Sequence, residues 1–134
     1  MPSLDTAVID ELSDAHALAP AWDELAVLQG LPLCAPGWML AWWEQMAPTG
    51  GVLRIVAIHD GAQLIALAPW FGQRGEAGRV DLRFLGAENS DRVDVLCRAG
   101  REREVRNALR AAIRTMRPRP DLVAFEAAPA SSQW

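Results

Sequence analysis

Two carboxylates in the segment SDRVD (90–94) are the first candidates for chemistry in this sequence. Asp91 and Asp94 stand three positions apart, at a turn that leads into an apolar run. From such a place both could point into one cleft, although acids at turns more often serve the turn itself and solubility. They lack the D-x-D-x-D-G spacing of a calcium loop. We therefore include both acids in a candidate substrate cleft and assign no metal site.

Tryptophan is concentrated in the stretch PGWMLAWWEQM (36–46), which holds three of the chain's six tryptophans. Its large apolar residues recur at helical spacing, so the stretch predicts a helix with an apolar stripe formed by Trp38, Met39, Trp42, Trp43 and Met46. A regular stripe favours packing against a sheet. The alternative is that one indole at the polar margin, Trp42 or Trp43, lines a substrate groove.

A second stretch adds two residues to this cleft. Pro69 falls inside a strongly β-type run, and because proline donates no backbone hydrogen bond, we expect the strand to splay there. We expect Trp70 beside it to be exposed and to form a cleft wall. The candidate substrate cleft therefore comprises Trp42, Trp43, Pro69, Trp70, Asp91 and Asp94.

No residue pattern identifies a catalytic group. The sequence has no G-x-S-x-G motif, and only two histidines, of which His59 ends a predicted strand and is interpreted as a turn residue. All basic residues are arginine, which excludes a Schiff-base lysine and a Walker-type phosphate lysine. Cys34 and Cys97 form no CxxC pair, and we expect both to be reduced, buried thiols.

Length and composition predict a globular chain. It has 134 residues, of which 51% are hydrophobic and 22% charged, with a net charge of -4. A net acidic chain is a poor partner for nucleic acid, because neutralising phosphates requires a basic surface. The acidic N-terminal segment does not resemble a signal peptide, and no run approaches the length of a membrane span, so we expect a cytoplasmic location.

Hydrophobic periodicity predicts helices over 15–29, 36–46 and 101–116, and strands over 4–9, 52–59, 63–71, 80–85, 93–97 and 121–126. Pro20 interrupts the first helix, whose regular part is expected to begin there. Asp60-Gly61 predicts an antiparallel hairpin. The order β-α-α-β-β-β-β-α-β predicts one α/β domain over residues 1–134, with flanking helices on a mixed sheet. The last strand is expected to lie parallel to the strand before the last helix.

Three segments share landmarks with a known family: APGWMLAWWEQM, VLRIVAIHDGAQLIALAPWFGQR and LRFLGAENSDRVDVLCRAG. The landmarks are a P-x-W-x-x-A-W-W helix, a hydrophobic-A-P strand end and an L-x-F-L-G turn that leads to S-D-x-x-D. Through them residues 5–127 resemble the amino-terminal half of bacterial GNAT-type acetyltransferases, the cellulose-biosynthesis protein CelD-like family. The resemblance implies a GNAT-like domain in a two-half enzyme, with acyl-CoA and catalysis mainly in the second half.

The acyl-CoA site of such an enzyme can be sought in the residues. A GNAT binds the CoA pyrophosphate at a helix N-terminus through Q/R-x-x-G-x-G/A, where small residues let the diphosphate approach backbone N–H groups. The corresponding stretch here, REREVR (101–106), has no glycine, and Glu102 and Glu104 would repel a diphosphate. We therefore assign this chain no catalytic and no cofactor-binding residue. An unusual CoA site is the alternative, with Arg101, Arg103 or Arg106 pairing directly with phosphates.

Two functions follow from these patterns. The first is a non-catalytic, acceptor-side domain of an acyltransferase, connected by family resemblance to cellulose or exopolysaccharide biosynthesis. Acetyl-CoA or another acyl-CoA would then serve the full-length enzyme, with a C-terminal GNAT half as partner and a small-molecule, sugar or amine acceptor. The second is a stand-alone binding or dimerisation module that retains a degenerate GNAT fold, with a homodimer partner.

Overall fold

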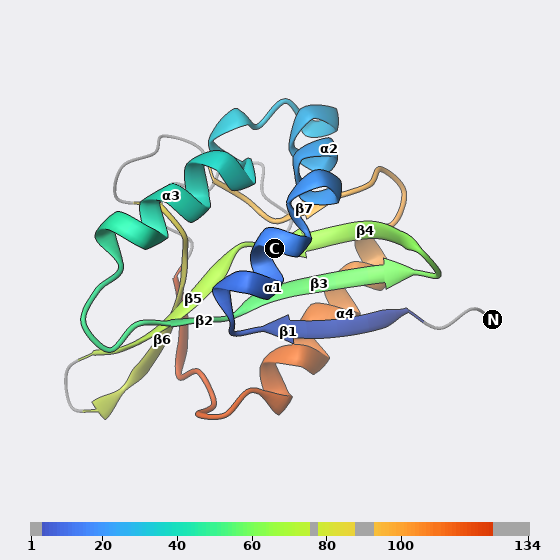
Figure 1. The fold of residues 1–134 in the computed structure, drawn as a ribbon. Coiled ribbons are helices and arrows are strands. Elements are labelled where there is room, and N and C mark those ends of the chain that lie inside the picture. The colour runs from blue at the N-terminus through green and yellow to red at the C-terminus, as the bar shows by residue number, and fades with distance from the viewer. Residues whose placement is uncertain (1–3, 76–77, 88–92, 125–134) are drawn as a thin grey trace.

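A computed structural model of the chain describes residues 4–75, 78–87 and 93–124. The helices are α1 (Leu12–Ala17), α2 (Ala19–Gln29), the short 3-10 helix η1 (Pro32–Cys34), α3 (Pro36–Met46) and α4 (Glu102–Thr115). The strands are β1 (Asp5–Ile9), β2 (Val52–Leu53), β3 (Ile55–Asp60), β4 (Gln63–Ala68), β5 (Trp70–Arg74), β6 (Val80–Phe84), β7 (Leu96–Cys97) and β8 (Leu122–Ala124). The protein is therefore a mixed α/β structure, as the sequence predicted (Figure 1).

The strands form two four-stranded sheets. The first sheet has the order β1-β3-β4-β7 and is antiparallel throughout. The second has the order β2-β5-β6-β8, antiparallel except for the parallel pair β6 and β8. Figure 1 shows α4 on one side of the first sheet and α1 and α2 on the other. Helices on both faces explain why Ile55–Ile58 of β3 and Leu64–Ala68 of β4 are buried at every position rather than at alternate ones.

The hairpin predicted at Asp60-Gly61 is confirmed, since β3 and β4 pair antiparallel with Asp60 opposite Gln63. Gly61 takes a φ of 60°, the left-handed backbone that a tight hairpin turn needs. The predicted splay at Pro69 is also confirmed. Pro69 separates β4 in the first sheet from β5 in the second, so one β-type run contributes to both sheets.

Two further predicted elements are divided in the structure, and one strand is longer than predicted. The helix expected over 15–29 is two helices that meet at Leu18, because Pro20 has no N–H to continue the first one. The strand expected over 52–59 is also two: β2 pairs with β5, and β3 pairs with β1 and β4. β5 continues to Arg74 into a segment expected to be a loop.

The predicted partner of the last strand is wrong. β8 pairs parallel with β6 of the second sheet, with Leu82 opposite Val123, whereas β7, the strand before α4, belongs to the first sheet. The parallel direction was expected but the neighbour was not. Adjacency in sequence misled here, because α4 returns the chain to the other sheet.

Candidate functional site

The aromatic residues of α3 close over β5. Trp42 and Trp43 both contact Phe71, with ring centroids 5.6 Å and 5.5 Å away. Trp42 is buried and Trp43 half-buried, and Leu40, outside the predicted stripe, is buried as well. Trp38 is 36% exposed and Met46 55% exposed, so the buried face is rotated from the predicted one toward Leu40. The interpretation of this stripe as core holds for Met39 and Trp42 and is wrong for Trp38 and Met46.

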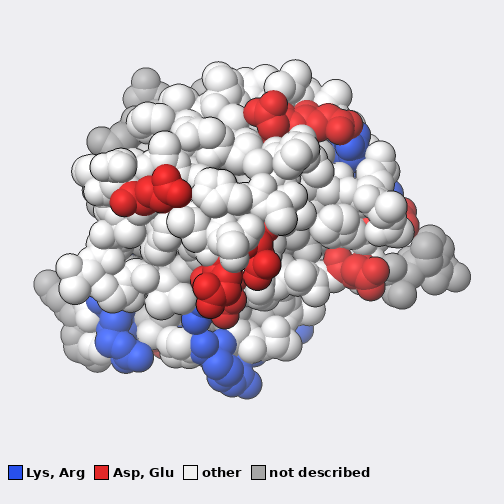
Figure 2. Space-filling view, in the orientation of Figure 1, with Lys and Arg blue, Asp and Glu red and all other residues white. Residues whose placement is uncertain are grey.

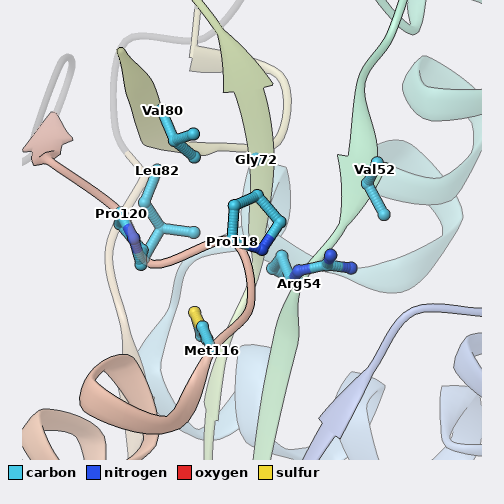
Figure 3. Close-up of a pocket in the computed structure, with 8 residues that line it drawn as sticks. All are labelled: Val52, Arg54, Gly72, Val80, Leu82, Met116, Pro118 and Pro120. Atoms are coloured by element: carbon cyan, nitrogen blue, oxygen red, sulfur yellow. The ribbon is translucent and has the colours of Figure 1, made fainter. Parts of the chain in front are cut away.

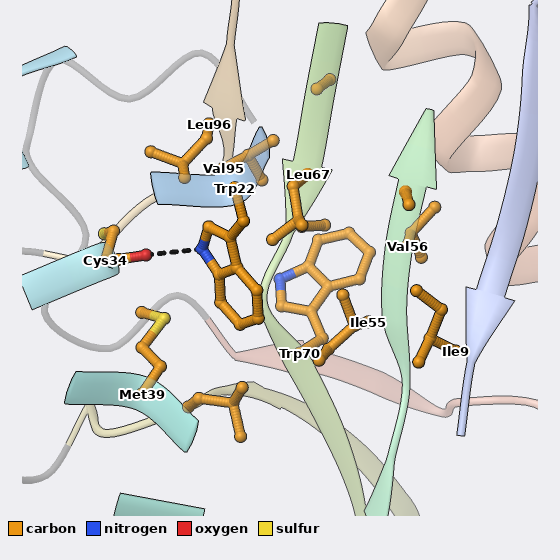
Figure 4. Packing of buried hydrophobic residues seen from close by; sticks show 14 of the residues in the cluster. Ile9, Trp22, Cys34, Met39, Ile55, Val56, Leu67, Trp70, Val95 and Leu96 are labelled. Atoms are coloured by element: carbon orange, nitrogen blue, oxygen red, sulfur yellow. Dashed lines mark hydrogen bonds between the residues drawn. The ribbon is translucent and has the colours of Figure 1, made fainter. Parts of the chain in front are cut away.

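The sequence suggested that Trp70 forms an exposed cleft wall, and this prediction is wrong. Trp70 is 2% exposed and lies 6.2 Å from the ring of Phe84. Side chains alternate along a strand, so Trp70 and its neighbour Phe71 point to opposite faces of β5. Figure 4 shows its indole among aliphatic core residues, near that of Trp22. Pro69 beside it is buried too.

The two buried indoles differ in their hydrogen bonding. Trp22 Nε1 donates to the main-chain oxygen of Cys34 at 2.7 Å (Figure 4). Trp70 Nε1 is buried and has no hydrogen-bond partner among the described residues. A buried, unbonded N–H is unfavourable, so the position is held by the packing of the ring rather than by its polar atom.

Of the two predicted acids, Asp94 is not gathered with these aromatic rings. Asp91 lies outside the described residues. Asp94 is half-buried, its Oδ1 accepts a hydrogen bond from Val95 N at 2.9 Å, and its main-chain oxygen lies 3.8 Å from Cys34 Sγ. Cys34 precedes α3, whereas Trp43 lies nine residues later, in the last turn of that helix. At 1.5 Å per residue, Asp94 and Trp43 therefore lie toward opposite ends of α3.

The junction between β7 and α4 is occupied by charges that pair with one another. Arg101 Nε donates to Glu104 Oε1 at 2.8 Å, and its Nη2 donates to Asp60 Oδ2 at 3.1 Å. These hydrogen bonds, that to Glu104 first, raise the pKa of the Arg101 guanidinium. Glu102 and Glu104 occupy the first turn of α4 and complement its N-terminal dipole. An anion approaching this helix end would meet two carboxylates.

Cys97 lies just before this junction and is confirmed as buried, as is Cys34, and the two are not joined by a disulfide. Burial, together with the charge of Glu102, raises the pKa of the Cys97 thiol to about 12. The thiolate is the reactive form of cysteine, so Cys97 is a poor nucleophile at neutral pH. His59, at the end of β3, is half-buried.

A small apolar pocket lies over the second sheet (Figure 3). Its floor is a row across three paired strands, with Val52 opposite Gly72 and Gly72 opposite Leu82. The segment after α4 covers it with Met116, Pro118 and Pro120. Its volume is about 40 Å³, room for only a few non-hydrogen atoms.

Arg54 is the charged residue of this pocket. Its Nη1 donates to Leu53 O at 2.8 Å and its Nη2 to Arg117 O at 3.3 Å, so the guanidinium fastens the segment after α4 to β2. A Cβ at Gly72 would lie 3.7 Å from the Arg54 Cγ, an ordinary van der Waals contact, so the arginine stem lies close above this glycine. Arg54 was not among the residues predicted to form a site. The available signal was a lone arginine within the apolar run VLRIVAI.

Two wider hollows lie at the two edges of the first sheet. One, of about 550 Å³, lies between β1 and α4 and is lined mainly by small or aliphatic side chains. The other, of about 470 Å³, lies between α2 and the β7–α4 junction and is lined by residues that include Gln29, Cys97 and Arg98. Figure 2 shows acidic and basic groups interspersed with neutral surface on the visible face, without one continuous patch of either sign.

Within 4–75, 78–87 and 93–124, no three His, Cys, Asp or Glu side chains come together as a metal site. None of the helices in these ranges has the length and apolar character that crossing a membrane requires. Comparison with known protein families, with curated proteins and with solved structures finds no match to this chain.

Proposed function

We propose that this chain is the non-catalytic, acceptor-side half of a GNAT-type acyltransferase, which needs a second GNAT half for acyl-CoA binding and catalysis. The mixed α/β architecture with helices on both faces of a sheet is compatible with the GNAT-like domain that the sequence resembles. In the chain α4 follows β7 and precedes β8, so a helix begins just after a strand here, which is the place where an enzyme of this kind binds its diphosphate.

The observation that carries the proposal is the charge at the start of α4. A helix N-terminus binds a diphosphate through free backbone N–H groups and a positive dipole. Here Glu102 and Glu104 occupy that turn, and Arg101, the residue that precedes the helix, is bonded to Glu104 and Asp60. An acyl-CoA would have to displace these carboxylates, so its binding is better supplied by another half.

The acceptor is proposed to be a small molecule, a sugar or an amine, with exopolysaccharide or cellulose biosynthesis as the setting that the resemblance implies. In this chain Trp42, Trp43 and Trp70 are packed against other rings. Exposed apolar side chains remain on α3 and β2, at Trp38, Met46 and Val52. We propose this margin as the surface on which the second half completes a cleft.

Thermal unfolding with and without millimolar acetyl-CoA tests the proposal, because a ligand that binds only the folded state raises the unfolding midpoint. We expect a cooperative transition whose midpoint does not change. The matched variant Glu102→Gln/Glu104→Gln removes both carboxylates. In this variant acetyl-CoA should raise the unfolding midpoint slightly, because the charges that oppose the diphosphate are gone. A clear shift in the wild type would contradict the proposal and support a self-contained acetyltransferase.

A stand-alone binding or dimerisation module is the second candidate. It is favoured by the hollow beside β1, the strand whose outer edge has no partner among the described strands. Light scattering after size-exclusion chromatography separates the two candidates, since a chain that is monomeric at every concentration would contradict a dimerisation module.

A further inference from the structure

The outer edge of β1 is an unused pairing surface. β1 is a terminal strand of the first sheet, bonded to β3 alone among the described strands. Asp5, Thr6, Ala7 and Val8 are all exposed. An exposed strand edge presents backbone N–H and C=O groups that can pair with another strand.

The hollow beside this edge belongs to the same surface. β1 contributes Thr6 and Val8 to it, and Leu4 lies just before the strand; the three residues alternate along the chain and so share one face. α4 contributes the small side chains Ala108, Ala111, Ala112 and Thr115, together with Glu104 and Asn107. We call the edge of β1 and this flank of α4 the β1–α4 surface.

We propose that the β1–α4 surface is the dimer interface of this protein, and that its occupant is a second copy with β1 antiparallel to β1. The pairing would join two first sheets into one continuous sheet about a two-fold axis. The surface would then contact its own copy, as a closed dimer requires. This inference does not depend on the acyltransferase proposal, and it assigns a surface and an occupant to the alternative module.

The spacing of the elements fits a second copy. α4 packs on both β1 and β3, and neighbouring strands lie about 4.8 Å apart. If α4 lies over the space between β1 and β3, its axis is about 5 Å to the side of a two-fold axis at the β1 edge. The two α4 helices would then lie about 10 Å apart, within the usual range for packed helices. The small side chains of Ala108 and Ala111 on the facing flank permit that approach.

The direction of α4 makes the charges complementary. Arg101, at the start of α4, contacts Asp60, and the preceding residue His59 pairs with Asp5 at the start of β1. α4 therefore begins over the start of β1, and a two-fold axis sets the two α4 helices antiparallel. The first turn carries Glu102 and Glu104, and the last turn carries Arg114.

Helical geometry places Arg114 beside the facing flank, because it lies three residues after Ala111 and seven after Asn107, both of which line the hollow. In the dimer Glu104 of each copy therefore comes close to Arg114 of the other. Arg114 is exposed, and its side chain makes no salt bridge to the described residues that would compete. Glu104 already accepts a hydrogen bond from Arg101 of its own chain, so Arg114 of the other copy would add a second cation beside this carboxylate. A foreign strand with uncharged side chains would leave Arg114 without a carboxylate, which favours a second copy as the occupant.

The test is the mass of the 14.6 kDa chain by light scattering over a concentration series, with three variants. We expect twice the monomer mass in the upper part of the series. Arg114→Glu should weaken dimerisation about tenfold or more, because it opposes two carboxylates across the interface. The matched control Arg119→Glu makes the same charge change at an exposed position between Pro118 and Pro120, beside the second sheet, and should leave the dimer intact. Ala111→Arg should abolish the dimer by blocking the approach of the helices.

Hydrogen exchange gives a readout that does not depend on folding defects. The outward amides of β1 should exchange more slowly as concentration rises, while those of β5 should not change. A wild-type chain that stays monomeric at every concentration would overturn the proposal. So would a dimer whose β1 amides gain no protection, or one that Arg114→Glu and Arg119→Glu weaken equally. Acetyl-CoA enters none of these measurements, so their failure is distinct from failure of the acyltransferase proposal.

Discussion

The two edges of the first sheet differ: the β7 edge is covered by α2, and the β1 edge has no partner among the described strands. At the β7 edge, Gln29 of α2 places its Oε1 2.6 Å from the main-chain nitrogen of Cys97 and accepts a hydrogen bond there. The side-chain amide of Gln29 thus accepts the hydrogen bond that a further strand would otherwise accept. At the other edge β1 is longer, with five residues, and no described residue occupies the corresponding position.

The difference shows which edge the chain protects. Proteins blunt sheet edges with short strands, covering helices or charges, and β7 has the first two, being two residues long with α2 beside it. β1 has an acid at Asp5 and another at Asp10, with Thr6, Ala7, Val8 and Ile9 between them. This uncharged run is the part of the edge that can pair.

The largest effect on the free energy of unfolding is expected from truncating the side chain that anchors α2, the helix that covers the β7 edge. Trp22 is the anchor of α2, with no exposed surface and a hydrogen bond to Cys34 O. Trp22→Ala should lower the free energy of unfolding by about 3–5 kcal/mol, measured by urea denaturation. Val27→Ala, on the same helix but 72% exposed, should change it by less than about 0.5 kcal/mol. Equal losses would mean that α2 is not anchored by its buried side.

A smaller effect is expected from removing the hydrogen bond that closes the edge. Gln29→Ala leaves the Cys97 N–H without its acceptor, which should cost about 1–3 kcal/mol. The same variant should speed hydrogen exchange at the Cys97 amide. Gln63→Ala, at an exposed position in β4, is the control and should change neither. If Cys97 exchanges at the wild-type rate in Gln29→Ala, another group protects this edge.

The closed edge illustrates what sequence could and could not predict. Hairpin chemistry at Asp60-Gly61, the proline at 69 and the periodicity of α3 and α4 are local signals, and they located most elements correctly. The bond from Gln29 to Cys97 joins residues far apart in the chain, and no local pattern encodes it. The division of the β-type runs between two sheets is likewise a matter of tertiary pairing.

The candidate site was less predictable than the fold. Trp70 was expected to be exposed because it follows a strand-breaking proline, yet Phe84 of the neighbouring strand covers it. Burial depends on what the rest of the chain places over a residue, which periodicity does not report. Arg54 shows the opposite error, because it was not predicted as part of a site. It lines the pocket together with Pro118 and donates a hydrogen bond to the main-chain oxygen of Arg117 (Figure 3).

Alkaline pH should weaken the closed edge. The pKa of Cys97 is raised by burial to about 12 from an ordinary value of 9.0. Between these values the unfolded chain loses the thiol proton and the folded chain keeps it, so stability is present below pH 9 and falls as pH rises toward 12. The slope should stay below the ~1.4 kcal/mol per pH unit of one fully coupled proton, because solvent screens the site.

The composition leaves few other side chains that titrate in this pH range. The chain has no lysine and no tyrosine, so its cysteines are the side chains that ionise in that window. Urea denaturation from pH 8 to 11 checks the slope, and Cys97→Ala should flatten it. A slope unchanged in Cys97→Ala would assign the loss to Cys34 instead.

The smallest effect is expected where the β7 edge meets α4. Arg101 is bonded to Glu104 and Asp60 at a partly exposed position, where an ion pair contributes little. Arg101→Gln should therefore destabilise the fold less than Gln29→Ala does, and the difference from wild type should vanish in high salt. Arg103→Gln, exposed in the same turn, is the control and should cost nothing. A loss that persists in high salt would mean that Arg101 acts by packing over Cys97, which would make it part of the closed edge rather than a charge beside it.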